Sequence, residues 1–148
     1  MSGTIRRMPQ KPLLEQPKKV AAYARVSSGK DAMLHSLSSQ VSYYSKLIQE
    51  HEGWLFIGVY TDEAMTGTKD GRDGFLKLLA DCRVGKINMI LTKSISRFAR
   101  NTVTLLETVR ELKSLGVDIV FEEQNIHTLS AEGELMLTIL ASYAQEES

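Results

Sequence analysis

Residues 18–31, KKVAAYARVSSGKD, decide the fold class of this 148-residue chain. The apolar part, residues 18–26, is predicted to be a buried β-strand, and the polar residues after it mark the strand's end. Side chains on a strand alternate between its two faces, so Tyr23, Arg25 and Ser27 share one face. A charged side chain is rarely buried without a partner. We therefore expect Arg25 to pair with an anion, either a carboxylate of the protein or a bound group, and a phosphate fits.

Strand and helix patterns alternate four times along the chain. This alternation favours an open, mostly parallel α/β sheet of flavodoxin-like topology, with helices on both faces. In such sheets, functional groups gather beyond the carboxyl ends of the strands. The predicted strands are residues 18–26, 54–61, 88–92 and 117–121, and the predicted helices are residues 36–51, 73–84, 99–115 and a final helix from about residue 132.

Each predicted helix has an apolar stripe that predicts which side chains face the core, such as Leu37, Val41, Tyr44 and Ile48 in the first helix and Phe75, Leu78, Leu79 and Cys82 in the second. The helix at residues 99–115 and the final helix both show apolar residues at helical spacing. The predicted inward residues are Val103, Leu106, Val109 and Leu112 in the former, and Leu135, Met136, Ile139, Leu140 and Tyr143 in the latter.

The composition is that of a single globular domain. Hydrophobic residues make up 43% of the chain and charged residues 24%, which argues against wholesale disorder. Residues 1–17 hold all three prolines and two adjacent arginines, and we expect a flexible basic arm there, followed by one domain at residues 18–148. Without a membrane-spanning run or a secretory signal, we expect a cytoplasmic protein that has no membrane partner.

The zero net charge hides an uneven distribution. Residues 1–113 carry 18 basic and 11 acidic groups, whereas residues 114–148 carry seven acidic groups and no basic one. A basic face that attracts polyanions is therefore compatible with the zero total. Cys82 is the only cysteine and the three histidines lack the spacing of metal ligands, so no metal site is predicted.

A second polar cluster follows the third predicted strand. Residues 93–101, KSISRFARN, place Arg97 and Arg100 three positions apart. If this segment is helical, both guanidinium groups lie on one face, with Asn101 one turn beyond Arg97. Two adjacent guanidinium groups repel each other, which is understandable when both bind a multiply charged group. This pattern again favours a phosphate.

Two more residues complete the candidate set. Arg72 ends a long polar loop at residues 62–72 and would supply a fourth arginine, while Gln40 adds an amide on the first helix. Hydrolase chemistry fits poorly, because the chain has no GxSxG motif and no histidine in the order Ser, Asp, His. Arginines beside a serine suit phosphoryl transfer, since cations offset charge on the phosphate oxygens.

These motifs resemble those of the serine recombinases, which include resolvases and invertases, and most of all the large serine integrases and conjugative-transposon recombinases. The resemblance covers residues 18–148 in the family's order and implies a resolvase-like fold. The similar segments are residues 23–27 (YARVS, the nucleophile motif), 36–40 (SLSSQ), 71–75 (GRDGF, the loop arginine), 94–101 (SISRFARN, the paired arginines), 125–128 and 144–148.

The resemblance implies site-specific strand exchange on double-stranded DNA. Ser27 would attack the scissile phosphodiester to give a 5′-phosphoserine linkage and a 3′-hydroxyl, and the exchanged ends would rejoin by the reverse step. No metal or nucleotide cofactor would be needed, because the phosphoserine ester conserves the energy of the broken bond. The protein would act as a dimer that forms a synaptic tetramer. The implied catalytic residues are Ser27, Arg25, Arg72, Arg97, Arg100 and Gln40.

Four other residues are candidates for substrate binding: Tyr23, Lys93, Ser96 and Glu147. Tyr23 could instead pack at the strand end, and Lys93 could be an ordinary surface lysine. Ser96 stands where resolvases usually have an aspartate. The resemblance also implies that a dimerisation helix and DNA-binding domains follow residue 148. Because no groove-reading motif is present in these residues, the chain by itself is expected to bind DNA weakly.

Two alternatives remain open at this point. The chain could be a non-catalytic signalling or binding module of flavodoxin-like topology that uses Asp62 and Glu63 as an acidic site. Those two residues could equally be solvated loop residues or partners of the arginines. The second alternative concerns the nucleophile, since Ser28 is next to Ser27, although strand alternation directs it to the opposite face from Arg25.

Overall fold

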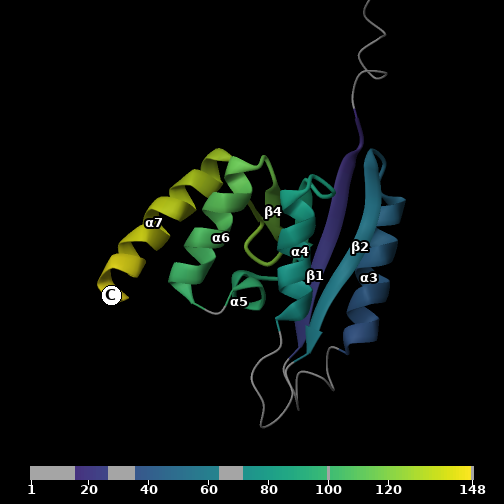
Figure 1. Ribbon diagram of the computed structural model, residues 1–148, viewed down its shortest axis with the longest axis horizontal. Helices are drawn as coiled ribbons and strands as arrows, with labels where there is room; N and C mark the ends of the chain where they lie inside the picture. The colour runs from purple at the N-terminus through teal and green to yellow at the C-terminus, as the bar shows by residue number, and fades with distance from the viewer. Residues whose placement is uncertain (1–15, 27–35, 64–71, 100, 148) are drawn as a thin grey trace, which may run out of the picture.

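A five-stranded sheet forms the centre of the computed structural model (Figure 1), which describes residues 16–26, 36–63, 72–99 and 101–147, the side chains of 143–147 excepted. The strand order is β2-β1-β3-β4-β5. The first four strands run parallel and β5 pairs antiparallel to β4. The strands are β1 (Lys18–Val26), β2 (Trp54–Glu63), β3 (Met89–Thr92), β4 (Asp118–Phe121) and β5 (Ile126–His127).

Helices cover both faces of this sheet, as predicted (Figure 1). One face carries α3 alone, and the other carries α4, α5 and α6, with α7 packed on the outside of α6. Among the described residues, none of the helices is long and apolar enough to cross a membrane. The helices are α3 (Leu37–Glu50), α4 (Asp73–Arg83), α5 (Ile95–Phe98), α6 (Thr102–Ser114) and α7 (Ala131–Glu147).

The first strand supplies the middle of the core, and its two faces alternate as the sequence predicts. Val20, Ala22 and Ala24 pack in the apolar cluster under α3, whereas Ala21 and Tyr23 pack in the larger cluster under the other helices. The strand lies between β2 and β3, so the chain leaves its carboxyl end at the point where the strand order reverses. Open parallel sheets bind their ligands at such switch points.

The fifth strand was not predicted. Residues 126–127 are too few to show a period in the sequence, and they pair with Val120 and Phe121 after a tight turn. Asn125 in that turn has a positive φ of 55°, a conformation that asparagine tolerates better than most residues. The added strand closes the edge of the sheet beside β4 and leads directly into α7.

The helix predicted at residues 99–115 is present as α6, but it begins three residues later, and the preceding arginine segment does not continue into it. The chain forms the single turn of α5, then extends at Ala99 (φ −135°, ψ 152°) before α6 begins. Two N-caps explain the break: the Ser94 side chain accepts a hydrogen bond from the Arg97 backbone N–H, and the Asn101 side chain accepts one from the Thr104 N–H. Each cap starts its own helix, so Arg97 and Asn101 do not share a helical face.

The predicted inward faces of the last two long helices are partly wrong. In α6, Leu106, Val109 and Leu112 are buried as expected, but Val103 is 41% exposed. In α7, Met136 and Leu140 pack against the core, Leu137 is the buried residue, and both Leu135 and Ile139 are exposed. Because α7 rests on α6, only a narrow stripe of α7 is covered. The Tyr143 side chain lies outside the described residues.

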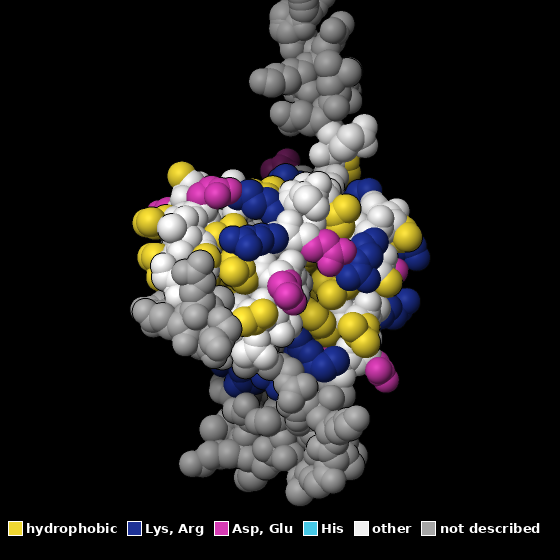
Figure 2. Space-filling model, turned by 60° about the vertical axis from the view of Figure 1, so that its left-hand side comes forward, with side chains coloured by type: hydrophobic (Ala, Val, Ile, Leu, Met, Phe, Trp, Pro, Cys, Tyr) yellow, Lys and Arg dark blue, Asp and Glu magenta, His cyan; other side chains and the backbone are white. Residues whose placement is uncertain are grey.

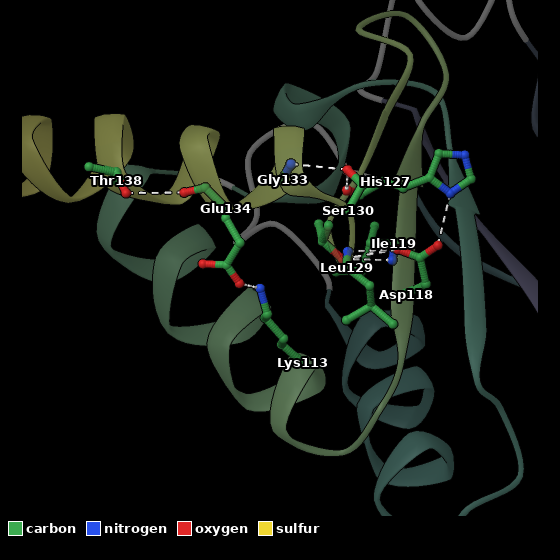
Figure 3. Close-up of polar contacts among 10 residues, drawn as sticks. Lys113, Asp118, Ile119, His127, Leu129, Ser130, Gly133, Glu134 and Thr138 are labelled. Atoms are coloured by element: carbon green, nitrogen blue, oxygen red, sulfur yellow. Dashed lines mark hydrogen bonds and ion pairs between the residues drawn. The ribbon is translucent and has the colours of Figure 1, made fainter.

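A buried carboxylate fixes the segment that joins β4 to α7 (Figure 3). Asp118, which is 7% exposed, accepts hydrogen bonds from the Leu129 N–H at 3.1 Å and the Thr128 hydroxyl at 3.4 Å, and lies 2.8 Å from His127 Nδ1. An ion pair between Lys113 and Glu134 then joins α6 to α7. The start of α7 is therefore held by polar contacts at the amino end of β4, far along the strand from the carboxyl edge.

Gly74, near the start of α4, lies too close to β2 to carry a side chain. A Cβ atom there would lie 2.1 Å from the Thr61 carbonyl oxygen, so the backbone of β2 or α4 would have to move. We expect Gly74→Ala to lower the free energy of unfolding by about 2 kcal/mol or more, measured by denaturant titration.

Gly58→Ala, in the strand β2 that Gly74 approaches, is the matched control. The nearest atom to a Cβ at Gly58 is a Tyr60 ring carbon at 3.9 Å, which is ordinary contact. This variant should keep the wild-type stability or gain slightly, because alanine suits a strand better than glycine does. Equal losses in both variants would contradict the proposed close approach at Gly74.

Candidate active site

Two of the predicted arginines hold each other at the carboxyl end of β1. Arg25 donates from Nε to the Arg97 carbonyl at 3.3 Å and from Nη2 to the Ser96 carbonyl at 3.2 Å. Arg97 in turn donates from Nη1 to the Arg25 carbonyl at 2.5 Å. The strand end and α5 are therefore joined by reciprocal side-chain-to-backbone hydrogen bonds. This arrangement brings Arg25 and Arg97 together, whereas Arg100, the predicted neighbour of Arg97, lies outside the described residues.

Arg72 reaches the same point from the start of α4. Its Nη2 donates to the Phe98 carbonyl at 2.8 Å and its Nη1 to the Tyr23 hydroxyl at 3.2 Å. The guanidinium carbon also lies 4.0 Å from the centre of the Phe75 ring, a cation–π distance. Figure 2 shows Lys and Arg side chains at the lower end of the described surface, where β1 and β2 finish in Figure 1. Three arginines from three elements thus meet around α5.

Tyr23 and Asp62 hold Arg72 through a chain of hydrogen bonds. The Tyr23 hydroxyl accepts from Arg72 and donates to the Asp62 carboxylate at 2.6 Å. Asp62 is 7% exposed and also accepts from the backbone N–H groups of Gly74 at 2.7 Å and Phe75 at 2.9 Å. Since Arg72 makes no side-chain cap bond for α4, Asp62 performs the capping from a neighbouring strand.

The interpretation of Asp62 as a solvated loop residue is therefore wrong. β2 runs on to Glu63, two residues beyond its predicted end, and this extension places Asp62 beside Arg25 in the register of β1 and β2. The carboxylate is occupied by three donors, so it is not an exposed acidic site. Sequence reasoning missed its capping role because the helix it caps begins more than ten residues later, beyond any local capping pattern.

The remaining described candidates line two hollows, one on each side of the sheet edge. Gln40 and Lys93 lie in a cavity of about 460 Å³ on the α3 side. Arg25 and Ser96 line a hollow of about 580 Å³ between α5, α6 and α7. The exposed Ser96 hydroxyl lies 3.1 Å from that of Ser94, the buried N-cap of α5. Four of the predicted residues thus line two separate hollows.

Three predicted residues cannot be placed. Ser27, its neighbour Ser28 and Arg100 lie outside the described residues, and only the backbone of Glu147 is described, at the end of α7. In the chain, Ser27 directly follows Val26, the last residue of β1. Their roles stay predictions. Within the described ranges, no three His, Cys, Asp or Glu side chains are grouped so that they could hold a metal ion.

The sequence matches the family of the resolvase N-terminal domain over residues 20–148. The chain belongs to this family. The Tn3 resolvase of Escherichia coli is 33% identical over 89 residues, which cover 60% of this chain and 46% of the resolvase. A resolvase/recombinase of Pseudomonas putida is 29% identical over 89 residues and is covered to 48%. The match therefore spans about half the length of these resolvases.

Solved structures of recombinases share the fold. The N-terminal catalytic domain of TP901-1 integrase has a TM-score of 0.70 and 30% identity, with 88% of this chain and 96% of that domain covered. A resolvase family site-specific recombinase from Streptococcus pneumoniae has a TM-score of 0.73 and 28% identity, with 88% and 87% covered. These matches confirm the predicted fold and the recombinase catalytic domain, and none of them supports the signalling module.

The hydrogen bonds of Asp62 predict that it stabilises the fold more than the neighbouring Glu63 does. Asp62→Ala would remove the acceptor for two backbone N–H groups and the Tyr23 hydroxyl, so we expect a loss of about 3 kcal/mol in denaturant unfolding. Tyr23→Phe removes one of these bonds and should cost about 1–2 kcal/mol. The control is Glu63→Ala, an exposed carboxylate one residue away, expected within about 0.5 kcal/mol of wild type. Equal stability of the Asp62 and Glu63 variants would contradict the capping role.

Buried tyrosines predict the response to alkaline pH. Tyr23 and Tyr44 are buried and Tyr60 is half-buried, and this burial, followed by a hydrogen bond to a carboxylate, raises the pKa of their hydroxyl groups above the ordinary value of about 10. A raised pKa means that folding favours the neutral phenol, so this stabilisation is complete below about pH 10 and is lost as pH rises further. We expect phenolate absorbance and loss of circular dichroism to rise together above pH 10. Ionisation of all tyrosines near pH 10 in an intact fold would contradict this.

Proposed function

We propose that this chain is the catalytic part of an enzyme that cleaves and rejoins double-stranded DNA at specific sites. The observation that carries the proposal is the convergence of Arg25, Arg72 and Arg97 at the end of β1, directly before Ser27 in the chain. Guanidinium groups suit a phosphodiester because their paired N–H donors match its oxygens and their charge offsets its own. Membership of the resolvase family supports the same substrate.

The proposed reaction is a transfer of the phosphoryl group to Ser27 and back. The serine Oγ forms a bond to phosphorus as the bond to the 3′-oxygen breaks, and the hydroxyl proton is balanced by the proton that the 3′-oxygen gains. The product is a 5′-phosphoserine ester and a 3′-hydroxyl. Attack by the 3′-hydroxyl of the exchanged strand reverses the step, so no metal or nucleotide cofactor is required.

The arginines would neutralise the phosphate during this transfer. Arg25, Arg72 and Arg97 donate hydrogen bonds to backbone carbonyls, which are neutral acceptors. A phosphodiester is a charged acceptor and forms stronger hydrogen bonds with guanidinium groups, so it can compete for these donors. Arg100 and Gln40 complete the proposed catalytic set.

The four candidates for substrate binding are supported by different observations. Tyr23 is 1% exposed and holds Arg72, so we propose that it orients the arginine. Lys93 shares a cavity with Gln40, which fits a phosphate contact on that side. Ser96 and Glu147 remain proposals for substrate binding. We also propose a dimer, a synaptic tetramer, DNA-binding elements elsewhere in the protein, a cytoplasmic location and the lack of a membrane partner.

Covalent trapping on DNA tests the nucleophile. The full-length protein, incubated with its recombination site and then denatured, should leave a covalent protein–DNA adduct. Ser27→Ala should abolish the adduct, whereas Ser28→Ala should retain it. For the arginines, Arg97→Lys should slow adduct formation by about 100-fold, because lysine cannot donate in a bidentate manner to the phosphate.

The control for the arginine variant is Arg110→Lys, an exposed position on α6 away from the sheet edge. It should form the adduct at the wild-type rate. Persistence of the adduct in Ser27→Ala would remove Ser27 from its proposed role. Equal rates for the Arg97 and Arg110 variants would show that Arg97 does not act on the phosphate.

A further inference from the structure

Glu122 ties the first helix to the carboxyl edge of the sheet. This residue follows β4 directly, and its backbone N–H donates to the Thr92 carbonyl at the end of β3 at 3.0 Å. Its carboxylate accepts hydrogen bonds from the Tyr44 hydroxyl at 2.7 Å and the Tyr43 hydroxyl at 3.2 Å. Both tyrosines belong to α3, far away in the sequence. Through its backbone and its carboxylate, this one residue connects two strand ends to one helix.

The contact is made at the end of α3 that carries Gln40. Tyr43 and Tyr44 lie three and four positions after Gln40, so all three occupy neighbouring turns of the helix. They line the same cavity of about 460 Å³ as Glu122 and Lys93. Apolar packing holds both halves of α3, through Leu37 and Tyr44 in the first half and Ile48 in the second. The hydrogen bonds of Tyr43 and Tyr44 to Glu122 add a directional contact beside Gln40.

The backbone beside Glu122 also leads to the arginines around α5. Thr92, whose carbonyl accepts from the Glu122 N–H, is the last residue of β3, and the Lys93 carbonyl accepts from the Glu123 N–H at 2.8 Å. The next residue, Ser94, is the N-cap of α5, which carries Arg97. Glu122 is therefore bonded to the strand end from which α5 starts. Burial and the hydrogen bond to Glu122 also raise the pKa of the Tyr44 hydroxyl.

We propose that Glu122 is a positioning residue of the active site. Through Tyr43 and Tyr44 it fixes the start of α3, and with it Gln40, relative to the arginines around α5. This inference rests on the proposed recombinase function. A hydrogen-bonded carboxylate suits this task because it fixes direction as well as contact, whereas apolar packing fixes contact alone. Neither Glu122 nor the two tyrosines needs to touch DNA.

The test uses the full-length protein with its recombination site. Glu122→Gln removes the charge, and Tyr44→Phe removes the shorter of the two hydrogen bonds. We expect each variant to form the phosphoserine adduct about 10-fold more slowly under single-turnover conditions, because small misplacements of an active-site group are costly in rate. DNA affinity should not change. The double variant should be no slower than the slower single variant, since both changes break one linkage.

Glu123→Gln is the matched control. It removes the same charge from the next residue, whose exposed side chain lines the same cavity. This variant should keep the wild-type rate. If Glu122→Gln and Glu123→Gln behave alike, the effect comes from local charge and the positioning role is overturned. Wild-type rates in both the Glu122 and Tyr44 variants would also overturn it.

Hydrogen exchange gives a readout that does not depend on catalysis. In Glu122→Gln and Tyr44→Phe, backbone amides in the first half of α3, up to Tyr44, should exchange faster, while those near Ile48 keep their protection. Faster exchange along all of α3, together with lower global stability, would indicate a merely structural role and overturn the proposal. If the wild type forms no adduct, the recombinase function fails, and the exchange pattern still decides whether Glu122 positions α3.

Discussion

The carbonyl groups of a one-turn helix need hydrogen-bond donors from elsewhere, and this constraint organises the active end of the molecule. In α5, the carbonyls of Ser96, Arg97 and Phe98 receive their donors from the guanidinium groups of Arg25 and Arg72. These contacts bring together the end of β1, the start of α4 and the turn after β3. The arginines are therefore gathered before any substrate arrives, which lowers the cost of ordering them around a phosphate.

Local patterns in the sequence were sufficient for the four parallel strands and for placing Arg25 and Arg97 at the same edge of the sheet. Alternation in β1 correctly separated the faces of Ala22 and Tyr23, and parallel strands bring their carboxyl ends to one edge. The break between α5 and α6 was missed although both caps, Ser94 and Asn101, are visible in the sequence. Apolar spacing was given more weight than capping there, and the short length of α5 hid its separate start.

Other features could not have been predicted, because they depend on contacts between distant segments. Asp62 caps α4 only because β2 and α4 meet in space, and Glu122 meets Tyr44 across 78 positions. The exposure of Leu135 and Ile139 likewise depends on contacts between distant segments. A helical stripe indicates which residues could be buried, but what covers the stripe is decided by neighbouring elements. α7 lies against α6, which covers only part of it.

On both sides of the sheet edge, a carboxylate accepts hydrogen bonds from tyrosine hydroxyl groups, although the residues differ. On the α4 side, the Asp62 carboxylate orients Tyr23, and Tyr23 accepts from Arg72. On the α3 side, the Glu122 carboxylate accepts from the hydroxyl groups of Tyr43 and Tyr44. Asp62 is separated from Arg72 by Tyr23, so it can orient this arginine without forming a direct ion pair that a phosphate would have to break. Direct pairing would neutralise the charge that the proposed reaction needs.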